Sequence, residues 1–288
     1  MEPSWPDKFL VALTRLLPAR LMGSFVYLLS RSRRPWLKNA LIRGFLRLYD
    51  VDTEEAAREI PEGYATFNEF FTRELRPDAR PVHSNPDQLL SPADGTIAQT
   101  GHAHNGHLLQ AKGIEFSATG LLANSLLASK LVKAPFATVY LAPYNYHRVH
   151  MPVAGRLRQT IFVPGKLYSV NARTTATIPE LYALNERLVC EFETDRGPFA
   201  LVLVGAMNVA SISTAWGGEI FPPADKKVIH SDYTEQTIEL AQGEYMGHFN
   251  MGSTVVMLGP AGNCAWHESL QPGQPVQVGT PIGELVPA

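Results

Sequence analysis

The chain has 288 residues, of which 45% are apolar and 18% are charged, a composition that excludes an intrinsically disordered protein. That length is enough for one large domain or two small ones. The net charge is only −2, and the two cysteines, Cys190 and Cys264, form neither a metal-binding spacing nor a disulfide framework, which indicates a reducing compartment.

The small net charge hides an uneven distribution. Residues 1–50 contain nine lysines and arginines against three acidic residues, a balance of +6. The other 238 residues therefore hold 16 basic and 24 acidic side chains, a balance of −8. A basic N-terminal region on an acidic body predicts that this region alone meets a negatively charged surface.

The basic region also carries apolar residues at helical spacing. They fall into two groups: Phe9, Leu10, Leu13, Leu16 and Leu17, then Leu37, Leu41, Phe45 and Leu48. Pro35 is well placed to start the second helix, with Lys38, Arg43 and Arg47 on its other face. The apolar run between them, residues 21–29, is too short for a membrane span of about 20 residues.

Two interpretations of this region, residues 1–62, stay open from its residues alone. Amphipathic basic helices lie in the interface of an anionic bilayer, and they also occur as helical pairs packed on a protein body. The opening residues Glu2, Pro3 and Asp7 lack the positive charge of a signal peptide, so we expect none.

The rest of the chain, residues 63–288, predicts a β-rich domain. Thr66 and Glu69 have the spacing of a capping box, and Pro77 is expected to end the helix that they begin. A leucine stripe predicts a helix over 117–131, and residues 271–286 have the closely spaced glycines and prolines of β turns. Short apolar runs predict strands at 136–143, 189–193, 200–204 and 254–258. We therefore expect an α+β fold, with a β-rich catalytic body and an N-terminal amphipathic helical region.

The candidate reaction centre is Gly252-Ser253, directly before the strand expected at 254–258. Gly252 has no Cβ, so its carbonyl can be approached closely, and the Ser253 hydroxyl is placed to attack it. In isolation Gly-Ser-Thr is also an ordinary turn. The sequence around Ser253 lacks the Gly-x-Ser-x-Gly elbow of many serine hydrolases.

Three other residues complete the candidate site. Asp94 lies in an Asp-Gly turn, and His147 and His150 follow the strand expected at 136–143. An aspartate, a histidine and a serine are the groups that activate a hydroxyl nucleophile. The two histidines also have a spacing that permits a shared metal on a helix, but Pro143 and Pro152 favour a turn and two separate roles.

After about residue 60 the chain resembles the pyruvoyl-dependent phosphatidylserine decarboxylase proenzymes of the prokaryotic type. The resemblance rests on many blocks in one order: FNEFFTREL at 67–75, RP at 80–81, SPADG at 91–95, YHRVHMP at 146–152, PGKLYSVN at 164–171, NER at 185–187, VGA at 204–206, GEYMG at 243–247 and GST at 252–254. One residue departs from the family pattern: Met251 stands where leucine is usual, a change that nearly conserves volume and polarity.

The resemblance implies a self-cleaving enzyme. Asp94 and His150 would act as a charge relay that activates Ser253, whose attack on Gly252 converts the amide to an ester. Elimination would then release a β chain of residues 1–252 and leave dehydroalanine at the start of an α chain of residues 253–288, to be hydrolysed to a covalent pyruvoyl group. That group would form a Schiff base with phosphatidylserine, and His147 would donate the proton that completes phosphatidylethanolamine after CO2 leaves.

The same resemblance sets the expected cofactor, partners and location. Pyruvate derived from Ser253 is the only cofactor expected, with no metal and no external group. The partners are the phospholipid substrate, the membrane surface and the two cleaved chains as a heterodimer, with a further dimer left open and no nucleic acid. The location is the cytoplasmic side of the cell membrane, as a peripheral protein. Two alternatives remain: a serine hydrolase that uses Asp94, His150 and Ser253 without cutting itself, and a non-catalytic lipid-binding protein.

Overall fold

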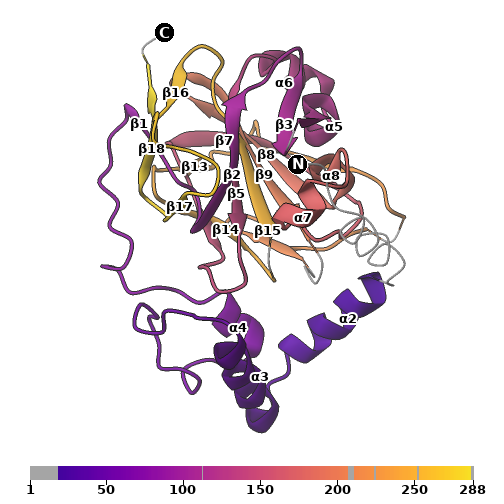
Figure 1. Cartoon of the computed structure of the whole chain (residues 1–288), viewed down its shortest axis with the longest axis vertical. Coiled ribbons are helices and arrows are strands. Elements are labelled where there is room, and N and C mark those ends of the chain that lie inside the picture. The colour runs from indigo at the N-terminus through magenta and orange to yellow at the C-terminus, as the bar shows by residue number, and fades with distance from the viewer. Residues whose placement is uncertain (1–18, 112, 207–210, 224, 252, 287–288) are drawn as a thin grey trace.

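The computed structural model describes residues 19–111, 113–206, 211–223, 225–251 and 253–286, and for residues 19–22 and 253 the backbone alone. A β-rich body forms the upper part of Figure 1, and three helices lie below it. These helices are α2 (Ala19–Ser30), α3 (Pro35–Leu48) and α4 (Phe67–Phe71). The helix expected over residues 9–17 lies outside the described residues.

Helix α3 begins at Pro35, as predicted, and packs on α4 through an aromatic cluster. The cluster of buried side chains comprises Ile42, Val51, Tyr64, Phe67, Phe70 and Phe71. Thr66 caps α4 by accepting a hydrogen bond from the Glu69 N–H, 3.0 Å away, which confirms the capping residue. The helix ends at Phe71, well before Pro77.

The prediction for the two faces of α3 is wrong at two residues. Lys38 is buried, and its ammonium group donates to the carbonyl oxygens of Pro61 at 2.9 Å and Tyr64 at 2.8 Å. Leu48, expected on the apolar face, is 73% exposed. The 59–64 turn packs beneath α3 and presents carbonyls that only a donor can satisfy, which periodicity alone does not reveal.

A nine-stranded antiparallel sheet forms the centre of the described body (Figure 1). Its order is β12-β7-β8-β9-β15-β5-β2-β17, with β13 also paired to β7. The strands are β2 (Gly95–His102), β5 (Pro135–Leu141), β7 (Gly155–Val163), β8 (Arg187–Thr194), β9 (Gly197–Gly205), β12 (Ile229–Asp232), β13 (Glu239–Leu240), β15 (Ser253–Leu258) and β17 (Pro275–Val276). All four predicted strands are present, as β5, β8, β9 and β15.

Smaller sheets and short helices cover both faces of this sheet. On one side lie a four-stranded sheet of β11 (Gly218–Ile220), β10 (Ile212–Thr214), β14 (Tyr245–Phe249) and β6 (Arg148–His150), and a three-stranded sheet of β1 (Gln88–Leu90), β18 (Pro281–Leu285) and β16 (Cys264–Trp266). On the other lie the hairpin β3 (His107–Ala111) and β4 (Ile114–Ser117) and the helices α5 (Ala118–Leu122), α6 (Ser125–Lys130), α7 (Ala172–Thr175) and α8 (Leu181–Leu184).

The helix predicted over residues 117–131 is two helices, so that prediction is wrong. Ala123 ends α5 in the left-handed conformation, with φ of 50°, and the Asn124 side chain caps α6 by accepting from the Leu127 N–H at 3.0 Å. Asparagine is a strong cap, and Leu121, Leu122, Leu127 and Leu131 still reach the same core, whereas Leu126 is exposed. The leucine spacing therefore predicted burial correctly except at Leu126, and it wrongly predicted one continuous helix.

The central strand β15 separates two cores. Val255 and Met257 face the core shared with the four-stranded sheet, and Val256 and Leu258 face the core under the short helices. A strand alternates its side chains between the two faces, so an apolar residue at every position fits a strand that is buried on both sides. The arrangement confirms an α+β fold with a β-rich body.

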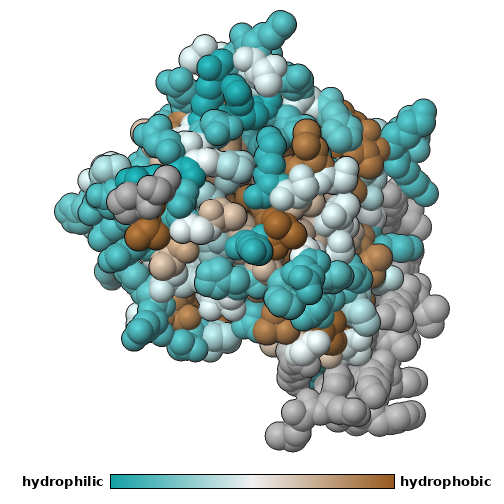
Figure 2. All heavy atoms as spheres, turned by 90° about the horizontal axis from the view of Figure 1, so that it is seen from above, coloured by the Kyte–Doolittle hydropathy of each residue, from teal (hydrophilic) through white to brown (hydrophobic). Residues whose placement is uncertain are grey.

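The surface differs between the two ends of the molecule. Seen from above, Figure 2 shows small apolar areas scattered among hydrophilic side chains. At the lower end Phe25 and Leu28 of α2 and Trp36 and Leu48 of α3 are all more than 65% exposed. Among the described residues, no helix combines the length and the apolar content needed to cross a bilayer.

Candidate active site

The Gly252-Ser253 pair lies at the entry to the central strand. Ser253 is the first residue of β15, with backbone partners Leu141 in β5 and Gly205 in β9. Gly252 and the side chain of Ser253 lie outside what the structure describes. Paired strands on both sides fix the chain immediately after the expected cleavage point.

The chain just before that point is fixed by Asn250. Its Nδ2 donates to the hydroxyls of Ser211 at 3.0 Å and Ser213 at 2.9 Å, and to Glu219 Oε1 at 3.3 Å. Its Oδ1 accepts from Asn68 of α4 at 2.9 Å. Asn250 is 2% exposed, so this network holds the backbone two residues ahead of Gly252.

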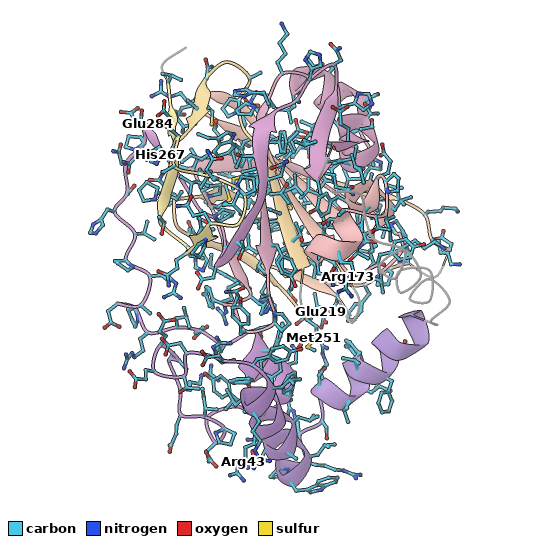
Figure 3. All side chains as sticks on the ribbon, viewed as in Figure 1. Arg43, Arg173, Glu219, Met251, His267 and Glu284 are labelled. Atoms are coloured by element: carbon cyan, nitrogen blue, oxygen red, sulfur yellow. The ribbon has the colours of Figure 1, made fainter. Side chains whose placement is uncertain are left out.

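Met251 lies between these two fixed points with φ of 92°, a backbone conformation that favours glycine. Its side chain packs against the aromatic cluster of α3 and α4. Glu219, which also pairs with Arg31 beyond the end of α2, lies beside Met251 at the junction of body and helices (Figure 3). The residue before Gly252 is therefore strained, and the surrounding structure holds it in that strain.

His147 is fully buried beside this junction. Its ring stacks on Phe71, with centroids 4.0 Å apart and planes inclined by 20°. Nε2 lies 3.3 Å from the carbonyl oxygen of Pro143, which only accepts, so Nε2 carries the proton. Nδ1 is then a lone pair, buried without a hydrogen-bond partner among the described residues. Burial lowers the pKa of His147 to about 3, so the imidazole is neutral at neutral pH.

His150 lies in a second environment. Its Nδ1 donates to the carbonyl oxygen of Gly243 at 2.9 Å, and its Nε2 accepts from the Tyr146 hydroxyl at 3.0 Å. Burial lowers the pKa of His150, and the nearby charge of Asp94 opposes that shift. His150 is therefore a neutral base, and the lone pair on its Nε2 accepts the hydrogen bond from Tyr146.

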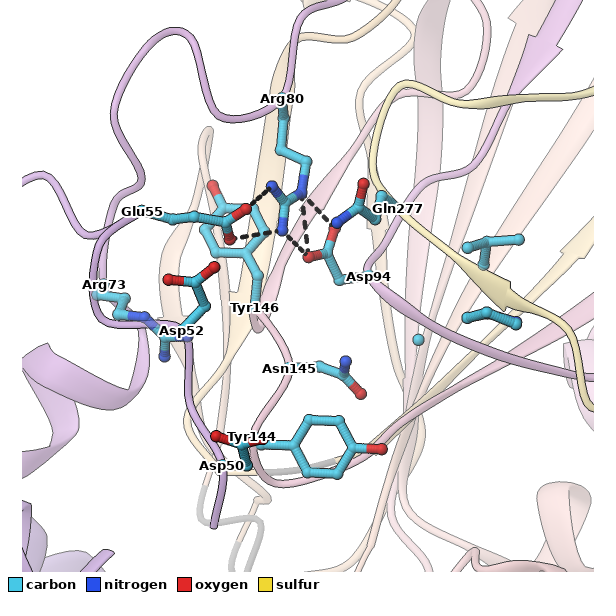
Figure 4. Close-up of a pocket in the computed structure, with 13 residues that line it drawn as sticks. Asp50, Asp52, Glu55, Arg73, Arg80, Asp94, Tyr144, Asn145, Tyr146 and Gln277 are labelled. Atoms are coloured by element: carbon cyan, nitrogen blue, oxygen red, sulfur yellow. Dashed lines mark hydrogen bonds and ion pairs between the residues drawn. The ribbon is translucent and has the colours of Figure 1, made fainter. Parts of the chain in front are cut away.

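Asp94 is buried in a network of charges rather than against a histidine. Arg80 Nε lies 3.0 and 3.1 Å from its two oxygens, Arg80 Nη2 lies 2.5 Å from Oδ2, and the Val278 N–H donates to Oδ1 at 2.8 Å. The other side of the Arg80 guanidinium binds Glu55 at 2.7 and 2.8 Å. Figure 4 shows this fork between the two carboxylates, with Tyr146 behind it.

The structure thus brings the sequence-predicted residues into one region without joining them all. In the described chain, Asp94 makes no hydrogen bond to His150. Tyr146 lies near both, since its hydroxyl donates to His150 and its side chain lines the same pocket as Asp94. Sequence reasoning missed Tyr146 and Arg80. A signal for Tyr146 was present, since residues four apart in an extended segment share a face.

A pocket of about 230 Å³ opens beside Asp94. It is lined in part by Glu55, Arg73, Arg80 and Tyr146, which come from the segments on either side of α4 and from the loop after β5 (Figure 4). Among the described residues, no three histidine, cysteine, aspartate or glutamate side chains are grouped as a metal ion would require. The strained junction, the two histidines and this pocket define a candidate site for acid–base chemistry on a small charged group.

Comparison with known proteins identifies the family. A family model described as phosphatidylserine decarboxylase matches residues 67–284, and a second model, described as PSD, matches residues 9–50. The chain belongs to the phosphatidylserine decarboxylase family, and the prediction of a decarboxylase is confirmed.

Relatives align over almost the whole chain. A phosphatidylserine decarboxylase proenzyme from Alkalilimnicola ehrlichii is 49% identical over 88% of this chain and 88% of its own length. Proenzymes of the same description from Methylococcus capsulatus and Azotobacter vinelandii are 45% and 46% identical, each over 96% of this chain and over 97% and 98% of their own lengths.

Proposed function

We propose that the chain decarboxylates phosphatidylserine to phosphatidylethanolamine and CO2, using a pyruvoyl group made from Ser253 by cutting its own Gly252–Ser253 bond. The products of that cut are a β chain of residues 1–252 and an α chain of residues 253–288. Membership of the phosphatidylserine decarboxylase family supports the reaction, and the description of its relatives as proenzymes supports the processing.

The observation that carries the self-cleavage is the strained Met251 between two fixed points. Asn250 is held by its buried network, and Ser253 is held by β5 and β9. Strain stored next to a reacting peptide is released when that peptide becomes an ester, which favours the product of serine attack.

His150 is the base for that attack. Its neutral state leaves Nε2 able to take the Ser253 hydroxyl proton once Tyr146 gives up its hydrogen bond. Asp94 supports this step electrostatically, because its negative charge favours the imidazolium that forms. Arg80 keeps the Asp94 carboxylate in place.

His147 acts later, as the proton donor in decarboxylation. A pyruvoyl carbonyl supplies the acceptor for the electrons left when CO2 departs from an amino acid. Nδ1 of His147 is a buried lone pair without a hydrogen-bond partner among the described residues, and it would take up the proton that the substrate ammonium group loses when it reacts with the pyruvoyl carbonyl. Burial makes the protonated His147 a strong acid, so that proton would pass readily to the carbon that CO2 leaves, and His147 would return to its neutral form.

The exposed apolar residues of α2 and α3 support a membrane-surface role. Phe25, Leu28 and Trp36 face away from the body beside exposed Arg33 and Arg34. Apolar side chains enter the lipid interface, and arginines bind anionic head groups. We therefore propose a peripheral enzyme of the membrane surface, on the cytoplasmic side that the resemblance to the prokaryotic family implies.

Intact mass spectrometry tests the proposal. Purified protein should give fragments of 252 and 36 residues (288 − 252 = 36), and borohydride should add two hydrogens to the smaller one. Ser253→Ala should remain one uncut chain without decarboxylase activity on phosphatidylserine vesicles. An uncut wild-type chain that still released CO2 would contradict the mechanism, and an uncut chain that hydrolysed esters would favour a serine hydrolase.

A further inference from the structure

Arg73 is a buried cation that makes no direct ion pair within the described chain, although the charges of Asp94 and Glu55 act on it from farther away. It lies two residues after the end of α4, is 4% exposed, and its guanidinium carbon lies 5.5 Å from the centroid of the Phe70 ring. Within the described chain its side chain has no hydrogen bond or ion pair, and its Nε is a buried donor without a partner. In Figure 4 dashed lines join Arg80 to two carboxylates, and none reaches Arg73.

Another buried arginine shows what a purely structural role looks like. Arg187 is 3% exposed, and it donates four hydrogen bonds to backbone carbonyls, those of Gly120, Leu121, Ala183 and Asn185. A guanidinium stays charged in proteins, so burying one without partners is costly. The contrast indicates that Arg73 is completed by a group that the protein chain does not supply.

The pocket beside Asp94 is the place where such a group would bind. Arg73 and Arg80 both line it, but Arg80 is already shared between Asp94 and Glu55. Two further carboxylates of the lining, Asp50 and Asp52, are exposed, so water and salt screen their charges. Among the described lining residues, Arg73 is thus the cation still able to bind an anion.

We propose that Arg73 binds the phosphodiester of the lipid head group, an inference that rests on the proposed function. The head group of phosphatidylserine carries two anions, the phosphodiester and the carboxylate that is lost. A guanidinium on the departing carboxylate would stabilise the substrate more than the transition state, in which that charge disappears. The phosphodiester keeps its charge throughout, so binding it carries no such penalty.

A binding experiment on the uncut chain tests the site separately from the reaction. Ser253→Ala protein is titrated with glycerophosphoserine, inorganic phosphate and free serine, and binding is followed by ³¹P NMR or, for serine, by competition. Glycerophosphoserine should bind, inorganic phosphate more weakly, and serine not at all. Arg73→Gln should weaken binding of both phosphates by about tenfold or more, as expected for a lost charged hydrogen bond.

Arg76→Gln is the matched control, because Arg76 lies three residues on and is 55% exposed. Equal affinity for inorganic phosphate would overturn the assignment to a lipid phosphodiester. So would serine binding as tightly as glycerophosphoserine, or no effect of Arg73→Gln. If Arg73→Gln does not fold, Arg73→Lys and the rise in Tm of the Ser253→Ala chain with glycerophosphoserine answer the same question.

Kinetics of the mature enzyme give a second, independent readout. A contact that is equal in substrate and transition state affects KM rather than kcat. In mixed micelles Arg73→Gln should raise KM about tenfold with kcat nearly kept, and Arg73→Lys should lie between it and wild type. A loss confined to kcat would place Arg73 on the reacting carboxylate and refute the proposal. Absence of self-cleavage would refute the proposed function and leave the binding result standing.

Discussion

The strained backbone of Met251 lies next to the residues of the expected cleavage site, Gly252 and Ser253, so we expect it to affect the rate of cleavage. A non-glycine residue at φ of 92° stores about 1–3 kcal/mol. Met251→Gly should relieve that strain and slow self-cleavage, by about tenfold for each 1.4 kcal/mol no longer released. The time course of fragment formation after synthesis measures the rate.

Met251→Leu is the matched variant for this prediction. It keeps the volume packed against the aromatic cluster and keeps the unfavourable φ, so cutting should proceed at the wild-type rate. If Met251→Gly cut as fast as Met251→Leu, strain at this residue would play no part.

Buried histidines make stability depend on pH. Burial lowers the pKa of His147 to about 3 and that of His248 to about 4, below the value near 6.5 of an unfolded histidine. Below pH 6.5 these histidines take up protons in the unfolded chain but stay neutral in the folded chain. The free energy of unfolding is therefore highest above pH 6.5 and falls toward pH 4. Each such histidine contributes a slope of about 1.4 kcal/mol per pH unit.

Urea unfolding of uncut Ser253→Ala protein between pH 4 and 7 measures this slope. Adding His147→Gln should reduce the slope by the contribution of one histidine, about 1.4 kcal/mol per pH unit. His102 is exposed, so His102→Gln controls for the loss of a histidine in general. An unchanged slope in the His147→Gln protein would mean that His147 binds a proton as readily in the folded chain as in the unfolded chain.

At the level of single residues, the sequence indicated candidate side chains for the site but did not indicate which residues they contact. His147 and His150 could be predicted to have separate roles, and the structure gives them different neighbours, Phe71 and Gly243. The pairing of Asp94 with Arg80 could not be predicted, because it joins segments through a turn whose path depends on the folded body. The same holds for the burial of Lys38 under carbonyls of the 59–64 turn.

Among the elements, α2 is the one whose exposed face most directly tests membrane binding. Phe25 is 66% exposed and Leu28 is 71% exposed. Burying each in a lipid interface is worth about 1.5–3 kcal/mol, so Phe25→Ser and Leu28→Ser should each reduce partitioning onto anionic vesicles by about tenfold or more. Vesicle sedimentation at fixed salt measures the partitioning.

Leu126→Ser is the control for that experiment. Leu126 is 67% exposed on α6, at the opposite end of the molecule from α2 (Figure 1). Its replacement should leave vesicle binding unchanged. Equal losses for all three variants would point to a general change in solubility and against a docking face on α2.

Elements could be predicted from the sequence where local pattern and tertiary burial agree. The strands β5, β8, β9 and β15 are buried on both faces, so each is a short apolar run, and its length and flanking turn residues favour a strand over a buried helix. The helix over 117–131 was mispredicted because Ala123 and Asn124 break the backbone without interrupting the leucine spacing. Strand order could not be predicted, since periodicity says nothing about which strands are neighbours.

For the whole molecule, the sheet should hold the two chains together after cleavage. The 253–288 segment contributes β15, β16, β17 and β18, which lie in two different sheets. Its buried residues include Val255, Val256, Met257, Leu258, Ile282 and Leu285. Size-exclusion chromatography of cut protein should therefore give one peak containing both fragments, which separate only in denaturant. Elution of the 36-residue fragment by itself from native protein would contradict this.

The position of β15 in the middle of the sheet also restricts when the Gly252–Ser253 bond can be cleaved. A strand hydrogen-bonded to β5 and β9 along its whole length cannot be slotted into a finished sheet from outside, since no edge is free to receive it. Synthetic peptide supplied to a separately produced 1–252 fragment should thus fail to restore activity. Translation as one continuous polypeptide, with scission delayed until the scaffold has assembled, is the route that this topology permits.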